Sequence, residues 1–216
     1  MSDLAPETEL SPPAVPAIAE AVTRKRPKPG ERRVQILQAL ATMLEQPGAE
    51  RITTAALASR LEVSEAALYR HFASKAQMFE GLIDFIEQSV FTLVNQIAER
   101  EPEPALRNRR LVVMVLQFAE KNPGMTRVMV GDALVFENDR LQERMNSFFD
   151  KLEASLKQNI RELAAAEGAA TPTVDAQVQA SVIVAFMMGR LQRFARSGFS
   201  RLPSEHLDAS LAVVLG

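Results

Sequence analysis

The sequence predicts an all-α protein, with a three-helix unit near the N-terminus and a larger helical domain after it. Three observations support this fold class. Apolar residues recur at helical spacing along most of the chain, and the stretch TTAALASRLEVSEAALYRHF, residues 53–72, has the caps and the tight turn of a helical hairpin. No hairpin of alternating strands and no βαβ pattern is present, so a sheet is not expected.

The first helix is expected at Glu31–Leu44, after a tail and a basic run. Residues 1–23 are rich in Pro, Ala and Glu, and we expect them to be disordered. The run RKRPKPGERR, residues 24–33, is either a solvated tail or an arm that contacts phosphates or the minor groove of DNA; its position before the hairpin favours the arm. The expected core stripe of this first helix is Val34, Leu37, Leu40, Ala41 and Leu44.

The hairpin should consist of two short helices. Thr54 can cap the first, which runs to about Leu61, and Ser64 can cap the second, where Glu65 suits the positive end of the helix dipole. Glu62 occupies the turn position that glycine usually holds, where positive φ costs a non-glycine residue roughly 1 kcal/mol. The expected apolar cluster is Leu57, Ala58, Leu61, Val63, Leu68 and Phe72.

The opposite face of the second hairpin helix is small and partly cationic. It carries Ala66, Ala67, Tyr69, Arg70 and His71. Such a face suits an α-helix lying in the major groove of DNA, although an ordinary helical hairpin is the alternative. Residues 24–78 contain ten Lys and Arg against five acids, a net charge of +5, and this excess favours the DNA-binding interpretation.

A long helix should follow from Ser74 to about Arg100. Ser74 and Gln77 form a capping box, and Lys75 places a cation at the start of the helix, where a phosphate is often bound. Phe85 lies off the core stripe, so it either packs against the next helix or belongs to a partner-binding groove. The expected stripe is Phe79, Leu82, Ile83, Ile86, Val90, Leu93, Val94 and Ile97.

The rest of the chain predicts further helices, whose expected bounds are about 105–121, 125–130, 138–167, 175–197 and 204–214. Two of them, 138–167 and 175–197, are long and apolar, which is typical of a four-helix dimer interface, although both could instead pack within one subunit. The apolar positions expected on the second are Val178, Val182, Ile183, Phe186, Met187 and Phe194. His206 is expected to face solvent without a role.

The composition argues against several classes of function. The chain has no cysteine and only His71 and His206, so we expect no metal, no cofactor and no Ser–His–Asp triad, and an enzyme is not the favoured interpretation. No apolar run is long enough to span a membrane, and the acidic, Pro-rich start does not resemble a signal peptide. We therefore expect a cytoplasmic protein.

The stretch ITTAALASRLEVSEAALYRHFASKAQMF, residues 52–79, resembles the TetR family of regulators. The resemblance implies a DNA-binding domain over residues 24–78 and a dimerisation and partner-binding domain over residues 79–216. It also implies base reading by the outward residues of the second hairpin helix and phosphate binding by Tyr69, His71 and Lys75. The predicted DNA-binding residues are Arg32, Arg33, Thr53, Thr54, Ser64, Ala66, Ala67, Tyr69, Arg70, His71 and Lys75.

Further segments are similar to one branch of that family, the nucleoid occlusion factors: RITTAALA, SEAALYRHFASKAQMFEGLIDFIE, EKNPGMTRVM and ALVFENDRLQERMN. This resemblance implies a homodimer, with one or two dimers on a palindromic chromosomal site, that captures the C-terminal tail of the division-ring protein FtsZ and needs no small inducer. The implied tail groove lies between the long helix and the next, at Phe85, Met114, Lys121 and Asn122.

The alternative is a repressor released by a small ligand, which needs a cavity with a few polar groups. The second domain contains no Trp or Tyr, which favours a filled core instead.

Overall fold

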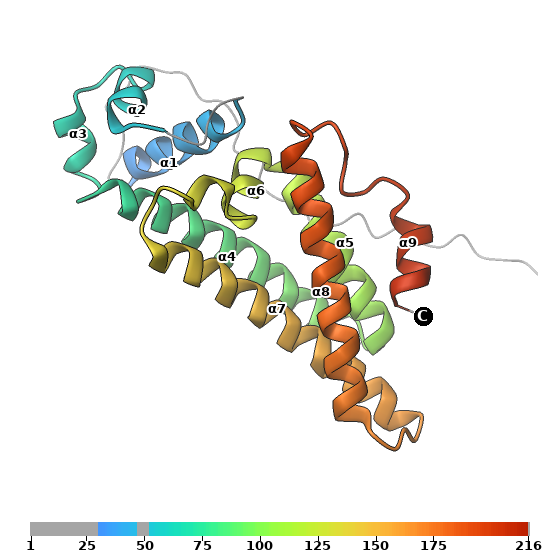
Figure 1. Ribbon diagram of the computed structural model, residues 1–216. Helices are drawn as coiled ribbons and strands as arrows, with labels where there is room; N and C mark the ends of the chain where they lie inside the picture. Colours follow the sequence, from blue (N-terminus) through green and yellow to red (C-terminus); the bar gives the residue numbers. More distant parts are fainter. Residues whose placement is uncertain (1–29, 47–51, 216) are drawn as a thin grey trace, which may run out of the picture.

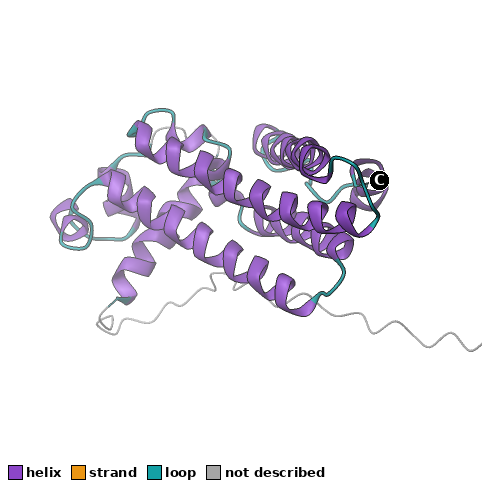
Figure 2. Ribbon diagram, turned by 90° about the horizontal axis from the view of Figure 1, so that it is seen from below, coloured by secondary structure: helices purple, strands orange, loops and turns teal. Residues whose placement is uncertain are grey.

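The computed structural model describes residues 30–46 and 52–215, and every regular element in those ranges is helical (Figures 1 and 2). The predicted tail, residues 1–23, and the basic run up to residue 29 lie outside the described residues. The elements are α1 (Glu31–Leu44), α2 (Thr54–Arg60), α3 (Glu65–Tyr69), α4 (Lys75–Arg100), α5 (Pro104–Lys121), α6 (Pro123–Met129), η2 (Asp132–Leu134), α7 (Asp139–Ala166), α8 (Pro172–Arg196) and α9 (Leu207–Val214).

The helices form two groups, joined by α4. We call α1–α3 the head and the remainder, α4–α9, the body. The head lies at one end of the molecule, and α4 runs from it into the body with α7 alongside (Figure 1). The most extensive contact in the chain is between α7 and α8, while α5 packs against α4, α7 and α8. The body is therefore a helical bundle built around α5, whose apolar residues Val112, Val115 and Leu116 are fully buried.

Proline sets three helix starts. The prediction for α1 is confirmed at both ends, and Asn138 caps α7 by accepting a hydrogen bond from the backbone N–H of Arg140. In contrast, α5, α6 and α8 begin at Pro104, Pro123 and Pro172, each earlier than the sequence pattern indicated. Proline suits the first helical position, because its ring fixes φ and its missing N–H has no helical acceptor there.

Several predicted core positions are exposed. Val34 is 59% exposed, because it lies in the first turn of α1, while Ile36 takes the buried position. On α8, Val178 is 61% and Val182 is 53% exposed, whereas Ile183 and Met187 are buried. The helix α8 therefore has two apolar faces, and only one of them is covered by the described residues.

One continuous apolar cluster extends from α1 to α9 through α4. The predicted domain boundary between residues 78 and 79 falls inside α4, between the buried side chains of Met78 and Phe79. Among the described residues, no helix is both long enough and apolar enough to cross a membrane.

Candidate nucleic-acid interface

The caps of the hairpin differ from the prediction at one position. Thr53, not Thr54, is the N-cap of α2, and its hydroxyl accepts a hydrogen bond from the N–H of Ala56 at 3.1 Å. Ser64 caps α3 as predicted, with its hydroxyl 3.3 Å from the N–H of Ala67. A cap needs extended backbone, which Thr53 has, whereas Thr54 is already the first helical residue. The Thr54 hydroxyl is therefore available to α3.

The turn between α2 and α3 is a Schellman motif centred on Glu62. Glu62 has φ 54°, as expected for a residue in the usual glycine position. The N–H of Val63 donates to the carbonyl of Ala58, and the N–H of Glu62 donates to that of Ser59. These two bonds close the end of α2 and offset the roughly 1 kcal/mol cost of a left-handed non-glycine residue.

The predicted apolar cluster holds α3 in place. Leu57, Ala58, Leu68 and Phe72 are buried, with Leu61 and Val63 partly buried against them. The other side of α3 is open: Ala66, Tyr69 and Arg70 are exposed, while Ala67 and His71 are half-buried. The structure thus brings the predicted base-reading residues onto one surface.

Glu65 is a residue of this surface that the sequence prediction did not include. Its carboxylate accepts a 2.6 Å hydrogen bond from the hydroxyl of Thr54, whose oxygen lies 3.5 Å from the hydroxyl of Tyr69. The three side chains connect the start of α2 to both ends of α3. A fixed carboxylate at the start of such a helix can accept a hydrogen bond from the amino group of a cytosine. Its position beside the N-cap Ser64 was the available signal.

The two predicted arginines of α1 point to different places. Arg33 donates to the backbone carbonyl of His71, and its guanidinium lies 4.1 Å from the centre of the Phe72 ring. Arg33 therefore ties α1 to the end of α3, with the remaining donors of its guanidinium still able to meet a phosphate. Arg32 donates to the side chain of Gln35 on the same helix at 3.0 Å.

Lys75, the predicted phosphate ligand at the start of α4, has an acidic partner in the body. Its ammonium lies 2.5 Å from a carboxylate oxygen of Glu137, in the segment between η2 and α7. The capping box differs in detail from the prediction: Ser74 accepts from the N–H of Gln77, but the Gln77 side chain accepts from Ala73 rather than from Ser74.

Further ion pairs join α4 and α7 beyond this first one. Arg140 pairs with Glu80, Arg144 contacts Asp84 at 2.7 Å and Glu87 at 2.5 Å, and Lys151 lies 3.5 Å from Glu87. Burial lowers the pKa of Arg144, but the hydrogen bonds and charges of Asp84 and Glu87 together outweigh it, so the pKa is raised above its ordinary value. In all of these pairs the acid is on α4, whereas at Lys75–Glu137 the cation is on α4.

Two of the four predicted partner-binding residues, Lys121 and Asn122, line one cavity. Phe85 and Met114 are half-buried against the core, while Lys121 is exposed. Asn122 is buried, and its amide donates to the carbonyl of Phe118 at 2.7 Å, so it joins α5 to α6. Lys121 and Asn122 line a cavity of about 160 Å³ whose other residues are Gln38, Ala41, Thr42, Glu45 and Met125. The opposite wall of this cavity is therefore α1, not α4.

The same cavity adjoins a close approach of α6 to α1. A Cβ atom on Gly124 would lie 2.0 Å from the backbone carbonyl oxygen of Ala41, so only glycine fits there. Burial raises the pKa of the nearby Glu45 carboxyl above its ordinary value of 4.5, and a hydrogen bond from the backbone of Gly124 partly opposes the shift.

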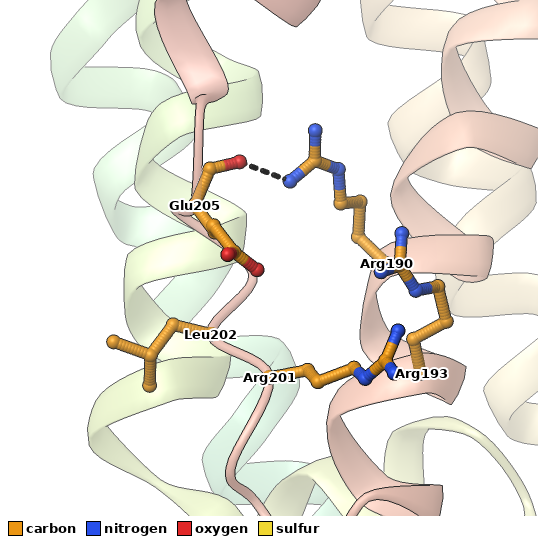
Figure 3. Close-up of a pocket in the computed structure, with 5 residues that line it drawn as sticks. All are labelled: Arg190, Arg193, Arg201, Leu202 and Glu205. Carbon is orange, nitrogen blue, oxygen red and sulfur yellow. Dashed lines mark hydrogen bonds between the residues drawn. The ribbon is translucent and has the colours of Figure 1, made fainter.

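A second, very small cavity lies between α8 and the loop before α9. Its volume is about 10 Å³, and it is lined by Arg190, Arg193, Arg201, Leu202 and Glu205. Figure 3 shows Arg190 reaching across to donate to the backbone carbonyl of Glu205, 2.5 Å away. This space suits one water molecule rather than a ligand. Within the described ranges, no group of three or more His, Cys, Asp or Glu side chains could hold a metal ion.

Two families of known proteins match the chain. Residues 36–82 match the bacterial regulatory proteins of the tetR family, and residues 103–215 match the tetracyclin repressor-like, C-terminal domain, in its SlmA-like form. The nucleoid occlusion factor SlmA of Idiomarina loihiensis is 50% identical over 183 residues, which cover 85% of this chain and 93% of the relative. That of Vibrio cholerae is 50% identical over 184 residues, covering 85% and 93%.

Solved structures share the same arrangement of helices at low sequence identity. The fatty acid degradation regulator FadR of Bacillus halodurans superposes with a TM-score of 0.70 at 16% identity, covering 88% of this chain and 97% of the other. The TetR family transcriptional regulator PfmR of Thermus thermophilus gives 0.68 at 20% identity, covering 84% and 97%. These likenesses confirm the all-α fold with an N-terminal helix-turn-helix and a C-terminal helical domain.

Proposed function

Because the chain belongs to the TetR family of regulatory proteins, in its SlmA-like branch, we propose that this DNA-binding regulator is a nucleoid occlusion factor. It acts in the cytoplasm on the nucleoid, as a homodimer on palindromic chromosomal sites. While bound there, it captures the C-terminal tail of FtsZ and antagonises assembly of the division ring. No catalytic step or cofactor is part of this proposal.

The observation that carries the DNA-binding part is the open face of α3. Ala66 and Tyr69 are exposed on a helix that is fixed from behind by Leu68 and Phe72, both 1% exposed. A small, rigidly held surface lets the helix approach base edges closely. Arg70, exposed just after α3, supplies positive charge for the phosphates, and Lys75 at the start of α4 would add to it once a phosphate replaces Glu137 as its partner.

The second apolar face of α8 supports the homodimer. Val174, Val178 and Val182 are each more than half exposed and recur at every fourth residue, so they form one stripe along the helix. Gly189 continues that side of the helix, and a Cβ atom there would meet nothing within 4 Å. A second copy related by a two-fold axis would cover this stripe with the same stripe. Footprinting should then show two half-sites roughly one turn of DNA apart, and a monomer on an asymmetric site would contradict the dimer.

The tail-binding part depends on Phe85, Met114, Lys121 and Asn122. Phe85 retains exposed surface although it packs against the core, as an apolar anchor for a peptide requires. Lys121 presents a charge beside the cavity at the joint of α1, α5 and α6. An extended peptide could reach both, with its apolar side chains near Phe85 and a carboxylate near Lys121.

The test is binding of an FtsZ tail peptide with and without operator DNA. Phe85→Ala should lower peptide affinity at least tenfold and leave DNA affinity within about twofold, because a hot-spot aromatic typically contributes about 2 kcal/mol or more. Phe91→Ala is the matched control, since Phe91 is also a half-buried phenylalanine of α4 packed on the core. Equal loss of peptide affinity, DNA affinity and melting temperature in both variants would assign Phe85 to the core.

One observation favours the alternative, a repressor released by a small ligand. The cavity of about 160 Å³ touches both head and body, so a ligand there could move one against the other. Pockets for drug-sized ligands generally have volumes of about 300–1,000 Å³, which exceed that of this cavity. A thermal-shift screen of apolar and aromatic compounds distinguishes the two functions: a stabilising compound that also releases DNA would favour the repressor.

A further inference from the structure

The ion pair between Lys75 and Glu137 joins the predicted DNA-contacting end of α4 to the body. Lys75 is the first residue of α4, and Glu137 belongs to the segment that leads into α7, 62 positions later. The two side chains are 27% and 10% exposed, so the carboxylate is the more buried partner. The contact is therefore neither fully solvated nor enclosed in the core.

Glu137 is held at this place by its backbone. Its N–H donates to the carbonyl of Leu134 at 2.9 Å, and two residues later Asp139 begins α7. The neighbouring Val135 and Phe136 are 69% and 63% exposed, so the chain turns inward at Glu137 to reach Lys75. The acid is thus directed at the cation that opens α4.

The Glu137 carboxylate and a DNA phosphate would both pair with the ammonium group of Lys75, and only one of them can do so at a time. The start of an α-helix, with its partial positive charge, attracts either anion. While Lys75 is paired with Glu137, the charges cancel and Lys75 adds little positive potential for DNA. If Lys75 turns to a phosphate, Glu137 loses its cation, and a mostly buried carboxylate without a partner is costly. The two contacts therefore oppose each other.

We propose that Glu137 is an internal competitor of the DNA phosphate for Lys75, and that this exchange lowers DNA affinity and links DNA binding to the segment before α7. The inference rests on the proposed DNA-binding function. Linkage is reciprocal, so any event that draws Glu137 away from Lys75 strengthens DNA binding, and DNA binding in turn releases Glu137. The segment that contains Val135 and Phe136 would then shift on the body.

The experiment measures operator affinity of the full-length chain with Glu137→Gln, which keeps the shape of the side chain and removes its charge. We expect roughly three- to fivefold tighter DNA binding, the upper part of the range for a partly exposed ion pair. Glu143→Gln is the control, because Glu143 is exposed on α7 and its removal changes the net charge equally. That variant should change affinity less than about twofold.

The effect must also depend on Lys75. In a Lys75→Ala background, Glu137→Gln should change affinity no more than Glu143→Gln does. Tighter binding that persists without Lys75 would overturn the competition, and weaker binding by Glu137→Gln would show instead that Glu137 positions Lys75 for DNA. If Glu137→Gln has a much lower melting temperature than the wild type, Glu137→Asp is measured in its place. The shorter aspartate side chain should pair less well with Lys75, so DNA affinity should increase by a smaller factor. Failure of the wild type itself to bind any DNA would count against the proposed function, not against the competition.

Discussion

Where α1 meets α6, the two helices touch through backbone, whereas the start of α4 meets the segment before α7 through the tips of two charged side chains. Gly124 leaves no room for a Cβ atom against the carbonyl of Ala41. At the other contact, Lys75 and Glu137 are joined over 2.5 Å and both retain some solvent exposure. The first contact fixes where the head sits. We expect the second to respond to an anion that approaches the head.

The backbone contact should show the largest effect when it is disturbed. Gly124→Ala must push α6 from α1, because the obstructing atom is a carbonyl oxygen that cannot rotate away. Overpacking of this kind costs about 1–3 kcal/mol, and we expect a melting temperature lower by several degrees together with weaker DNA and peptide binding. Calorimetry and both binding assays check this.

Gly81→Ala is the matched control for that prediction. Its new Cβ would meet the end of the Leu37 side chain at 3.0 Å and the edge of the Phe72 ring at 3.3 Å; both are side-chain atoms, and Leu37 can rotate, so the site can adjust more easily than a backbone carbonyl. The control should lose clearly less stability than Gly124→Ala. Equal losses of stability in the two variants would mean that the α1–α6 contact is no more rigid than the α1–α4 contact.

The charged contact should show a smaller, salt-dependent effect. Lys75→Ala should weaken binding to all DNA sequences and lower the slope of log affinity against log salt by about 0.9, the value for one lost phosphate contact. Lys151→Ala is the control, because Lys151 also pairs with an acid of α4 but lies further along α7. A salt slope that Lys75→Ala leaves unchanged would remove Lys75 from the phosphate ligands.

The smallest expected effect is on melting temperature, when Glu45, which lies beside the contact of Gly124 with α1, is replaced. Burial raises the pKa of Glu45, so the folded state holds its proton more tightly than the unfolded state does. Binding of this proton stabilises the folded state. The stabilisation is fully present below pH 4.5, the ordinary pKa of the group, and is lost as the pH rises through the raised pKa. Glu45→Gln should therefore melt slightly higher at neutral pH, with the gain vanishing near about pH 4. A variant that melts lower at neutral pH would show that the ionised carboxylate is needed there.

Local pattern was enough to predict the head in detail. The helix Glu31–Leu44, the cap at Ser64, the positive φ at Glu62 and the cluster around Leu68 and Phe72 are confirmed, because each depends on residues a few positions apart. The prediction that Val34 lies in the core was wrong, for a related reason. Periodicity gives the side of a helix, but not whether a neighbour covers its first turn.

The contacts between distant segments could not be predicted in this way. Nothing near Lys75 in the sequence indicates Glu137, and nothing in the α5 pattern indicates that the cavity at Lys121 faces α1. Asn122 could be identified as a candidate partner residue only by resemblance, and the structure shows its amide already bonded to Phe118. Its role in tail binding, like those of Phe85 and Met114, stays a prediction.

The helix α4 is uninterrupted from the head into the body, so a small tilt of it would move the head appreciably. With 26 residues, it is about 39 Å long at about 1.5 Å per residue, so a tilt of about 5° at its body end would displace the head by about 3 Å. In a two-fold dimer, a tilt of α4 in each subunit would change the distance between the two α3 helices twice over. That distance would then no longer match the length of one turn of DNA. The ion pairs at Glu80, Asp84 and Glu87 join the half of α4 nearer the head to α7. If a dimer of this chain reads a palindromic operator as proposed, we expect its selectivity to depend on the stiffness of α4 as well as on the residues that contact bases.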